Sequence, residues 1–77
     1  MKVKKLVAKK EKVLVEGREY IALLTPDMEG GFTVQCKEEP AAISEGETEE
    51  EALNNLIDAL ELCLEHEREW QARKTGD

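Results

Sequence analysis

The sequence predicts an α+β fold, in which a three- or four-stranded antiparallel sheet is followed by one long C-terminal helix packed on one sheet face. Short β-branched and alternating runs between turn residues predict the strands, and a leucine stripe at three- and four-residue spacing predicts the helix. With 77 residues, the chain has room for one domain, expected to span residues 1–77. Within it we expect a lysine-rich strand or arm at 1–12, a β-meander at 13–45 and a helix at 48–74.

The first two strands are expected to form a hairpin. A short β-branched run at 13–15 is followed by turn residues at 16–19 and by a second apolar run at 20–24. Pro26 stops that second strand, and the glycines at 30–31 suit a tight reversal of the chain. The pattern therefore places a third strand directly after the reversal.

The third strand alternates between apolar and polar residues. Phe32, Val34 and Cys36 share one face, and the polar residues between them share the other. Pro40 lies in a segment that breaks the ladder, and Ala41 to Ser44 is long enough only for a brief edge strand. One face of this sheet is therefore expected to be buried.

The helix has the most specific signals. Thr48 is a good N-cap, and Glu51 stands where its carboxylate can reach back to the Thr48 backbone amide, as in a capping box. Leucines at three- and four-residue spacing then form one apolar stripe. Glu69 and Arg73 are placed as an i,i+4 pair near the end. We expect the core to contain Leu23, Phe32, Val34, Leu53, Leu56, Ile57, Leu60 and Leu64.

The charge of the chain is unevenly distributed. Its formal net charge is −7, which argues against a protein that mainly holds phosphate backbones. Residues 1–18 nevertheless carry seven Lys or Arg against two Glu, whereas residues 19–77 carry four against sixteen acidic residues. No apolar run is long enough to span a bilayer, so we expect no membrane contact.

The cysteines predict a cytoplasmic protein with reduced thiols and no cofactor. Cys36 and Cys63 form no Cys-x-x-Cys pair, and no signal peptide is recognisable. His66 is the only histidine that could join them in a zinc site, so a metal site is not expected. A chain this short needs reinforcement, and self-association is the remaining means. The run 20–24 is apolar on both sides, which favours a homodimer or a higher homo-oligomer.

The order of several motifs resembles the HicB-like antitoxin family. The motifs are the Gly30-Gly31-Phe32 strand start, the proline at 40, the helix start at 44–53, and the helix residues 55–56 and 59–62. The resemblance covers roughly 20–64 and implies an antiparallel sheet with one helix, akin to part of the ribonuclease H fold. It also implies binding of a small basic mRNA-cleaving toxin (HicA-like), often by dimers or larger oligomers.

Two features depart from the family pattern. The proline turn reads Glu39-Pro40-Ala41-Ala42 and lacks the usual leucine, glycine and cysteine. No DNA-binding segment follows the helix in this sequence, so the expectation is a stand-alone N-terminal-type domain without operon repression. An orphan oligomeric module without a toxin partner therefore remains an alternative.

The acidic residues are assigned to partner binding rather than to catalysis. A metal-dependent nuclease needs carboxylates that converge from strand interiors, and the runs 20–24 and 32–36 contain none. We therefore expect no enzyme activity, and we interpret His66 as a surface residue. An acidic surface could steer onto a basic toxin; its candidates are Asp27, Glu29, Glu38, Glu39, Glu45 and Glu47. The alternative is that these charges only confer solubility.

The lysines at the start of the chain allow a competing hypothesis of weak nucleic-acid binding. Six lysines lie within residues 2–12, but no aromatic residue lies between them to stack on bases. Lysine on an edge strand also blocks sheet-to-sheet aggregation. We therefore expect nucleic acid not to be the partner.

Overall fold

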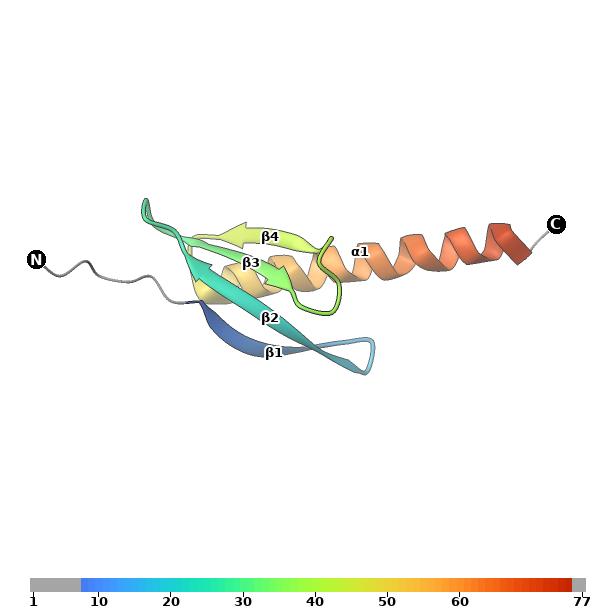
Figure 1. The fold of residues 1–77 in the computed structure, drawn as a ribbon, viewed down its shortest axis with the longest axis horizontal. Helices are drawn as coiled ribbons and strands as arrows, with labels where there is room; N and C mark the ends of the chain where they lie inside the picture. The colour runs from blue at the N-terminus through green and yellow to red at the C-terminus, as the bar shows by residue number, and fades with distance from the viewer. Residues whose placement is uncertain (1–7, 76–77) are drawn as a thin grey trace, which may run out of the picture.

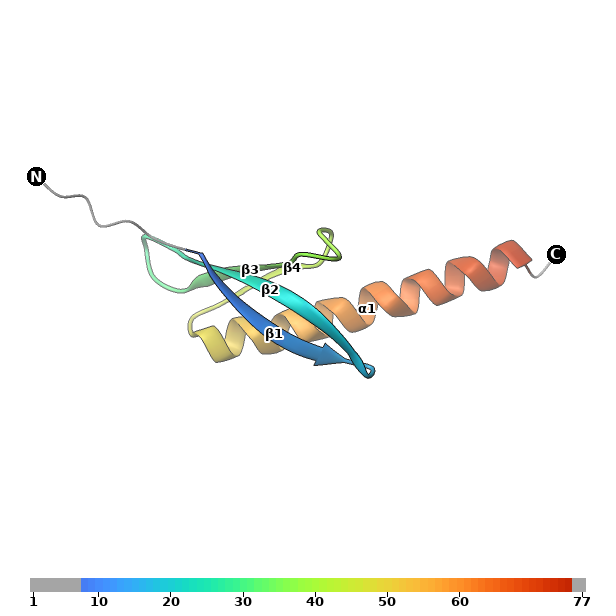
Figure 2. The ribbon, with the colours of Figure 1, turned by 60° about the horizontal axis from the view of Figure 1, so that its bottom comes forward.

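The computed structural model describes residues 8–75, with side chains as far as Gln71. Its elements are β1 (Lys9–Val15), β2 (Arg18–Pro26), β3 (Phe32–Cys36), β4 (Ile43–Gly46) and α1 (Glu49–Thr75). The four strands form one antiparallel sheet in the order β1-β2-β3-β4, and α1 lies along one face of it (Figure 1, Figure 2). The predicted α+β fold is confirmed, with four strands.

The lysine-rich segment 1–12 was predicted to be either a strand or an arm, and the structure shows a strand from Lys9 onward. Residues 1–7 lie outside the described residues. The edge strand predicted at 41–44 begins and ends two residues later, at Ile43–Gly46.

The β1–β2 hairpin closes with a turn of two residues. Val15 pairs with Arg18, so only Glu16 and Gly17 lie between the paired strands. Both have positive φ angles, 52° and 78°. Such turns match the right-handed twist of paired strands, and glycine adopts the second position without strain. The turn predicted at 16–19 is therefore shorter, because its last two residues belong to β2.

Alternate residues of the strands pack against α1 and form the core. Its buried members are Val13, Val15, Tyr20, Ala22, Leu24, Val34, Cys36, Ala42, Ala52, Leu56 and Leu60. Of the predicted core residues, Val34, Leu56 and Leu60 are fully buried. The partly buried residues packed on this core include Phe32, Leu53, Ile57 and Leu64.

Leu23 was wrongly predicted to lie in the core. The buried neighbours Ala22 and Leu24 point toward α1, and successive side chains of a strand alternate between faces. Leu23 therefore lies half-buried on the open face of the sheet, which points away from α1. There it pairs with Lys10 of β1. The apolar run 20–24 conceals this alternation in the sequence.

The open face of the sheet mixes apolar and polar side chains. Leu14 is 65% exposed and Ile43 is 55% exposed, and Ile21 and Leu23 are half-buried between them. Lys10 and Lys12 pair with the two central residues of this face. The face that the sequence predicted to be left uncovered is therefore present in the structure.

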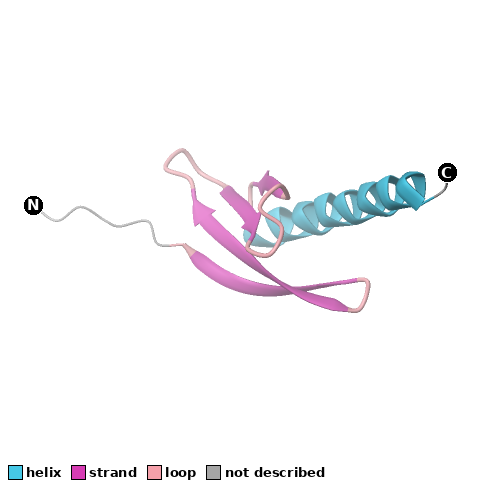
Figure 3. Ribbon diagram, turned by 45° about the vertical axis from the view of Figure 1, so that its right-hand side comes forward, coloured by secondary structure: helices cyan, strands magenta, loops and turns pink. Residues whose placement is uncertain are grey.

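The helix is longer than the sheet that it covers. Its first half lies against the strands, and its second half continues past them (Figure 2, Figure 3). A two-point ion pair joins Arg68 of α1 to Glu16 of the hairpin turn, with both N–O distances at 3.2 Å. Beyond this pair, Trp70 is 55% exposed. Over the described residues, no helical stretch combines the length and hydropathy that crossing a membrane requires.

Candidate functional site

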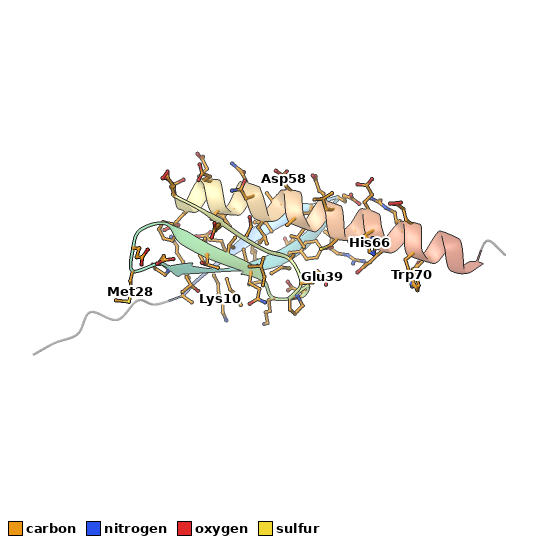
Figure 4. All side chains as sticks on the ribbon, turned by 90° about the horizontal axis from the view of Figure 1, so that it is seen from above. Lys10, Met28, Glu39, Asp58, His66 and Trp70 are labelled. Carbon is orange, nitrogen blue, oxygen red and sulfur yellow. The ribbon has the colours of Figure 1, made fainter. Side chains whose placement is uncertain are left out.

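The six predicted acidic residues fall into two groups at opposite ends of the sheet. Asp27, Glu45 and Glu47 line one hollow of about 310 Å³, where the β2–β3 turn meets the start of α1. Glu29 is exposed in the same turn, whereas Glu38 and Glu39 lie in the β3–β4 loop. Figure 4 shows the separation: Met28, in the turn, and Glu39 lie at different ends of the strands. The structure therefore does not bring all six residues into one surface.

The hollow includes two further residues that the sequence did not assign to a site. Glu51, predicted only as a capping residue, is a fourth acidic residue in its lining. Phe32, predicted only as a core residue, is half-buried and also lines it. We name the hollow formed by Asp27, Phe32, Glu45, Glu47 and Glu51 the acidic hollow.

The β2–β3 turn fixes Asp27 at the rim of this hollow. Its backbone N–H donates to the Gly31 carbonyl at 2.9 Å, and its own carbonyl accepts from the Gly30 N–H at 3.0 Å. Its side-chain Oδ1 also accepts from the Glu29 N–H at 3.0 Å. A carboxylate has several lone-pair positions, so this bond leaves Asp27 able to accept from a ligand.

The chain between β4 and α1 fixes the other wall. The Asn55 side-chain amide donates to the Glu45 carbonyl at 2.7 Å, which ties β4 to the helix. A Cβ atom on Gly46 would overlap the backbone of the first helical turn, so the two backbones are in direct contact there. Glu45 and Glu47 are therefore carried on backbone that has little freedom to move.

One of the two hydrogen bonds of the predicted capping box is present. The Glu51 N–H donates to Thr48 Oγ1 at 3.0 Å, which confirms Thr48 as the N-cap. The Glu51 carboxylate, however, accepts from the backbone N–H of Glu47 at 2.7 Å rather than from that of Thr48. Because Gly46 packs directly on the first turn of α1, the amide of the next residue is the one within reach.

At the other end, Glu38 has a structural role. Its carboxylate accepts from the Ile21 backbone N–H at 2.9 Å, and the Cys36 thiol lies 3.7 Å away. The bond from Ile21 lowers the pKa of Glu38 below its ordinary value. The carboxylate thus completes the end of the β2–β3 ladder, and any change of charge there also changes the sheet.

Glu39 is in a different environment from its neighbour. Burial raises the pKa of Glu39, and its hydrogen bond with the Glu67 carboxyl raises it further. Both residues line a second hollow, of about 320 Å³, whose other lining residues are Ala41, Leu62, Cys63 and His66. We name this the helix-side hollow.

The cysteines and the histidine lie much as predicted. Cys36 is buried and Cys63 is half-buried, and both are free thiols whose pKa is raised, chiefly by burial. His66 is exposed on α1 (Figure 4). Across the described side chains, no group of three or more His, Cys, Asp or Glu residues is arranged to hold a metal ion.

One lysine of the first strand is paired with the helix start. Lys9 Nζ lies 3.0 Å from Glu49 and 3.4 Å from Glu11. The hydrogen bond with Glu49 raises the pKa of Lys9. Lys10 and Lys12 are exposed, and Lys2, Lys4 and Lys5 lie outside the described residues, as does the side chain of Arg73.

Comparison with known proteins gives one distant relative. The chain is 37% identical over 46 residues to the UPF0150 protein ssr1765 of Synechocystis sp.. This match covers 60% of the present chain and 58% of that relative, which is less than two thirds of either. No protein-family model matches the chain, and no solved structure matches it. The chain is therefore distantly similar to a protein of UPF0150, a HicB-like family.

Proposed function

We propose that this protein is a non-catalytic protein-binding module of the antitoxin type, which neutralises a small basic mRNA-cleaving toxin at the acidic hollow. The observation that carries this proposal is that four acidic residues, from the β2–β3 turn, β4 and the start of α1, line one hollow. The distant similarity to a protein of UPF0150, a HicB-like family, agrees with the resemblance of the sequence motifs to HicB-like antitoxins.

The chemistry of the acidic hollow suits a lysine or arginine side chain. The carboxylates offer hydrogen-bond acceptors for a cationic head group, and an arginine can bind such groups at two points. Phe32 is half-buried and lines the same hollow, so its exposed part can contact the apolar stem of such a side chain. A basic toxin would also be steered toward this end by its charge, so binding should weaken as salt increases.

The same carboxylates favour binding over catalysis. Asp27 accepts a backbone hydrogen bond within its turn, and Glu51 accepts one at the start of the helix. These bonds keep both groups at the surface in roles that support the local backbone, where a partner can reach them. We therefore assign no reaction to this site.

The test pairs this protein with any small basic protein that an adjacent reading frame encodes. Co-purification and rescue of growth from that neighbour's toxicity would support the antitoxin function, and failure of both would reject it. Glu45→Lys and Glu47→Lys should each weaken binding by about tenfold or more and reduce its dependence on salt. Each change reverses one charge at an exposed position.

Glu61→Lys provides the matched control. Glu61 is exposed on α1 and does not line the acidic hollow, so the same reversal of charge there should leave affinity almost unchanged. If toxin binding is intact in both hollow variants, the function stands but the acidic hollow is not the site. Glu38 is unsuitable for this test, because its carboxylate supports the sheet.

A further inference from the structure

We propose that the distal half of α1 forms an antiparallel homodimer, in which Trp70 of each copy packs into the helix-side hollow of the other. This inference does not rest on the proposed toxin binding, because it concerns a different surface. It also differs from association through the open sheet face, which the sequence alone favoured. Its basis is a protruding aromatic residue and a hollow on the same side of one helix.

The protruding group and the hollow are both accessible in the structure. Trp70 is 55% exposed and Leu62 is 67% exposed, although both are large apolar side chains. The helix-side hollow, about 320 Å³, lies between α1 and the β3–β4 loop and is lined on its apolar side by Ala41, Leu62 and Cys63. An indole ring is a group that such a hollow can receive.

The spacing along α1 makes this surface complementary to itself. Leu62, His66 and Trp70 follow one another at four-residue intervals, which places them along one side of the helix. His66 is the midpoint of the three. If two helices pair antiparallel about a two-fold axis at His66, Trp70 of each copy meets Leu62 of the other. A two-fold interface requires this reciprocity, in which the same two positions exchange contacts.

The position of the hollow on α1 excludes the chain's own Trp70 as its occupant. Trp70 lies two helical turns beyond Leu62 on the same helix, so it cannot fold back into the hollow beside Leu62. The end of α1 also extends past the sheet, which leaves space for a second helix (Figure 3).

The charged residues beside Leu62, His66 and Trp70 predict how the dimer responds to salt. Glu65 and Glu67 flank His66 on both sides, and the antiparallel pairing places these glutamates of the two copies along the same edges. These like charges repel each other across the two copies, and salt screens this repulsion. Dimerisation should therefore strengthen as salt increases, whereas binding of a basic toxin should weaken. The opposite salt dependence distinguishes dimerisation from toxin binding in an experiment.

Sedimentation of the full chain tests the interface. Trp70→Ala should raise the dimer dissociation constant by about tenfold or more, because a large buried aromatic side chain carries much of the energy of a small interface. Leu14→Ala is the matched control, since Leu14 is similarly exposed but lies on the open sheet face. Circular dichroism should show that both variants remain folded. The proposal is overturned if Trp70→Ala leaves association unchanged, or if the native chain stays monomeric at millimolar concentration.

Cysteine cross-linking tests the antiparallel orientation. In a Cys63→Ala background, His66→Cys should form a covalent dimer under mild oxidation, because the two copies of residue 66 face each other at the axis. Leu62→Cys should not, because its two copies would lie about 12 Å apart along the helices, at roughly 1.5 Å per residue, beyond the reach of a disulfide. Cross-linking at both positions would indicate parallel helices and overturn the proposal, as would cross-linking at neither.

Discussion

A Cβ atom on Gly46 would lie 2.5 Å from the backbone nitrogen of Ala52, at the point where β4 passes the first turn of α1. It would also lie 2.8 Å from the Glu51 carbonyl carbon. Each of these neighbours is backbone, which cannot rotate away as the end of a side chain can. Glycine at this position therefore lets β4 and α1 make direct contact, and this contact sets the shape of the acidic hollow.

Replacing Gly46 by alanine should destabilise the fold by about 1–3 kcal/mol or more, because one added methyl group forces two backbone segments apart. Urea denaturation followed by circular dichroism measures the change. Gly17→Asn serves as the control, because nothing lies within 4 Å of a Cβ there and asparagine tolerates a positive φ. Equal stability of native protein and Gly46→Ala would contradict the close contact.

The importance of Gly46 could not be predicted from the local pattern of the sequence. Gly46 was recognised only as part of a motif, and no turn rule requires glycine before a capped helix. The requirement comes from two elements that meet in space. The helix itself could be predicted from Thr48 and the leucine stripe, because capping and periodicity are local properties of the chain.

The acidic residues also show that contacts between distant parts of the chain cannot be predicted from local sequence. Asp27, Glu45 and Glu47 were predicted as partner-binding residues from charge alone, and the fold brings them together with Glu51. Charge alone could not reveal that Glu38 is used inside the sheet, because its partner, the Ile21 amide, is 17 positions away in the chain. The prediction that Leu23 lies in the core was wrong for a related reason. In an uninterrupted apolar run, composition does not indicate which residues face the helix.

The start of α1 offers a second prediction. Thr48→Ala should cost about 0.5–2 kcal/mol, because the Glu51 N–H loses its acceptor, and Thr48→Ser should cost much less because its hydroxyl oxygen remains. Glu51→Ala should cost about 0.5–1.5 kcal/mol through loss of the bond from the Glu47 N–H. Chemical denaturation of the three variants measures these differences. A Thr48→Ser variant as unstable as Thr48→Ala would show that the hydroxyl does not cap the helix.

Two leucines test the assignment of the core. Leu56 is fully buried between α1 and the sheet, so Leu56→Ala should cost about 2–5 kcal/mol through lost burial and the cavity left behind. Leu14 is 65% exposed on the open face, and Leu14→Ala should cost less than about 1 kcal/mol. Thermal unfolding at a concentration below the dimer dissociation constant separates these effects from association. Similar losses in the two variants would mean that the helix does not cover the face assigned to it.

The adjacent residues Glu38 and Glu39 should affect stability with opposite dependence on pH. The pKa of Glu38 is lowered, chiefly by the Ile21 N–H. This carboxylate therefore stabilises the fold at pH values above its ordinary pKa of 4.5. That contribution is lost as pH falls through the lowered pKa. Glu38→Gln should therefore be less stable than the native protein at neutral pH, and the difference should shrink in acid.

The sign reverses for Glu39, whose pKa is raised by burial and by the neighbouring Glu67 carboxyl. A raised pKa means that the folded state holds the proton more tightly, so the contribution is fully present below 4.5 and is lost as pH rises through the raised pKa. Glu39→Gln stays neutral at every pH and keeps a donor for Glu67, so it should be more stable than the native chain at neutral pH. In acid the two should converge. Urea titrations across this range check both variants, and a Glu39→Gln variant less stable than native at neutral pH would show that the Glu39–Glu67 contact is not a repulsive one.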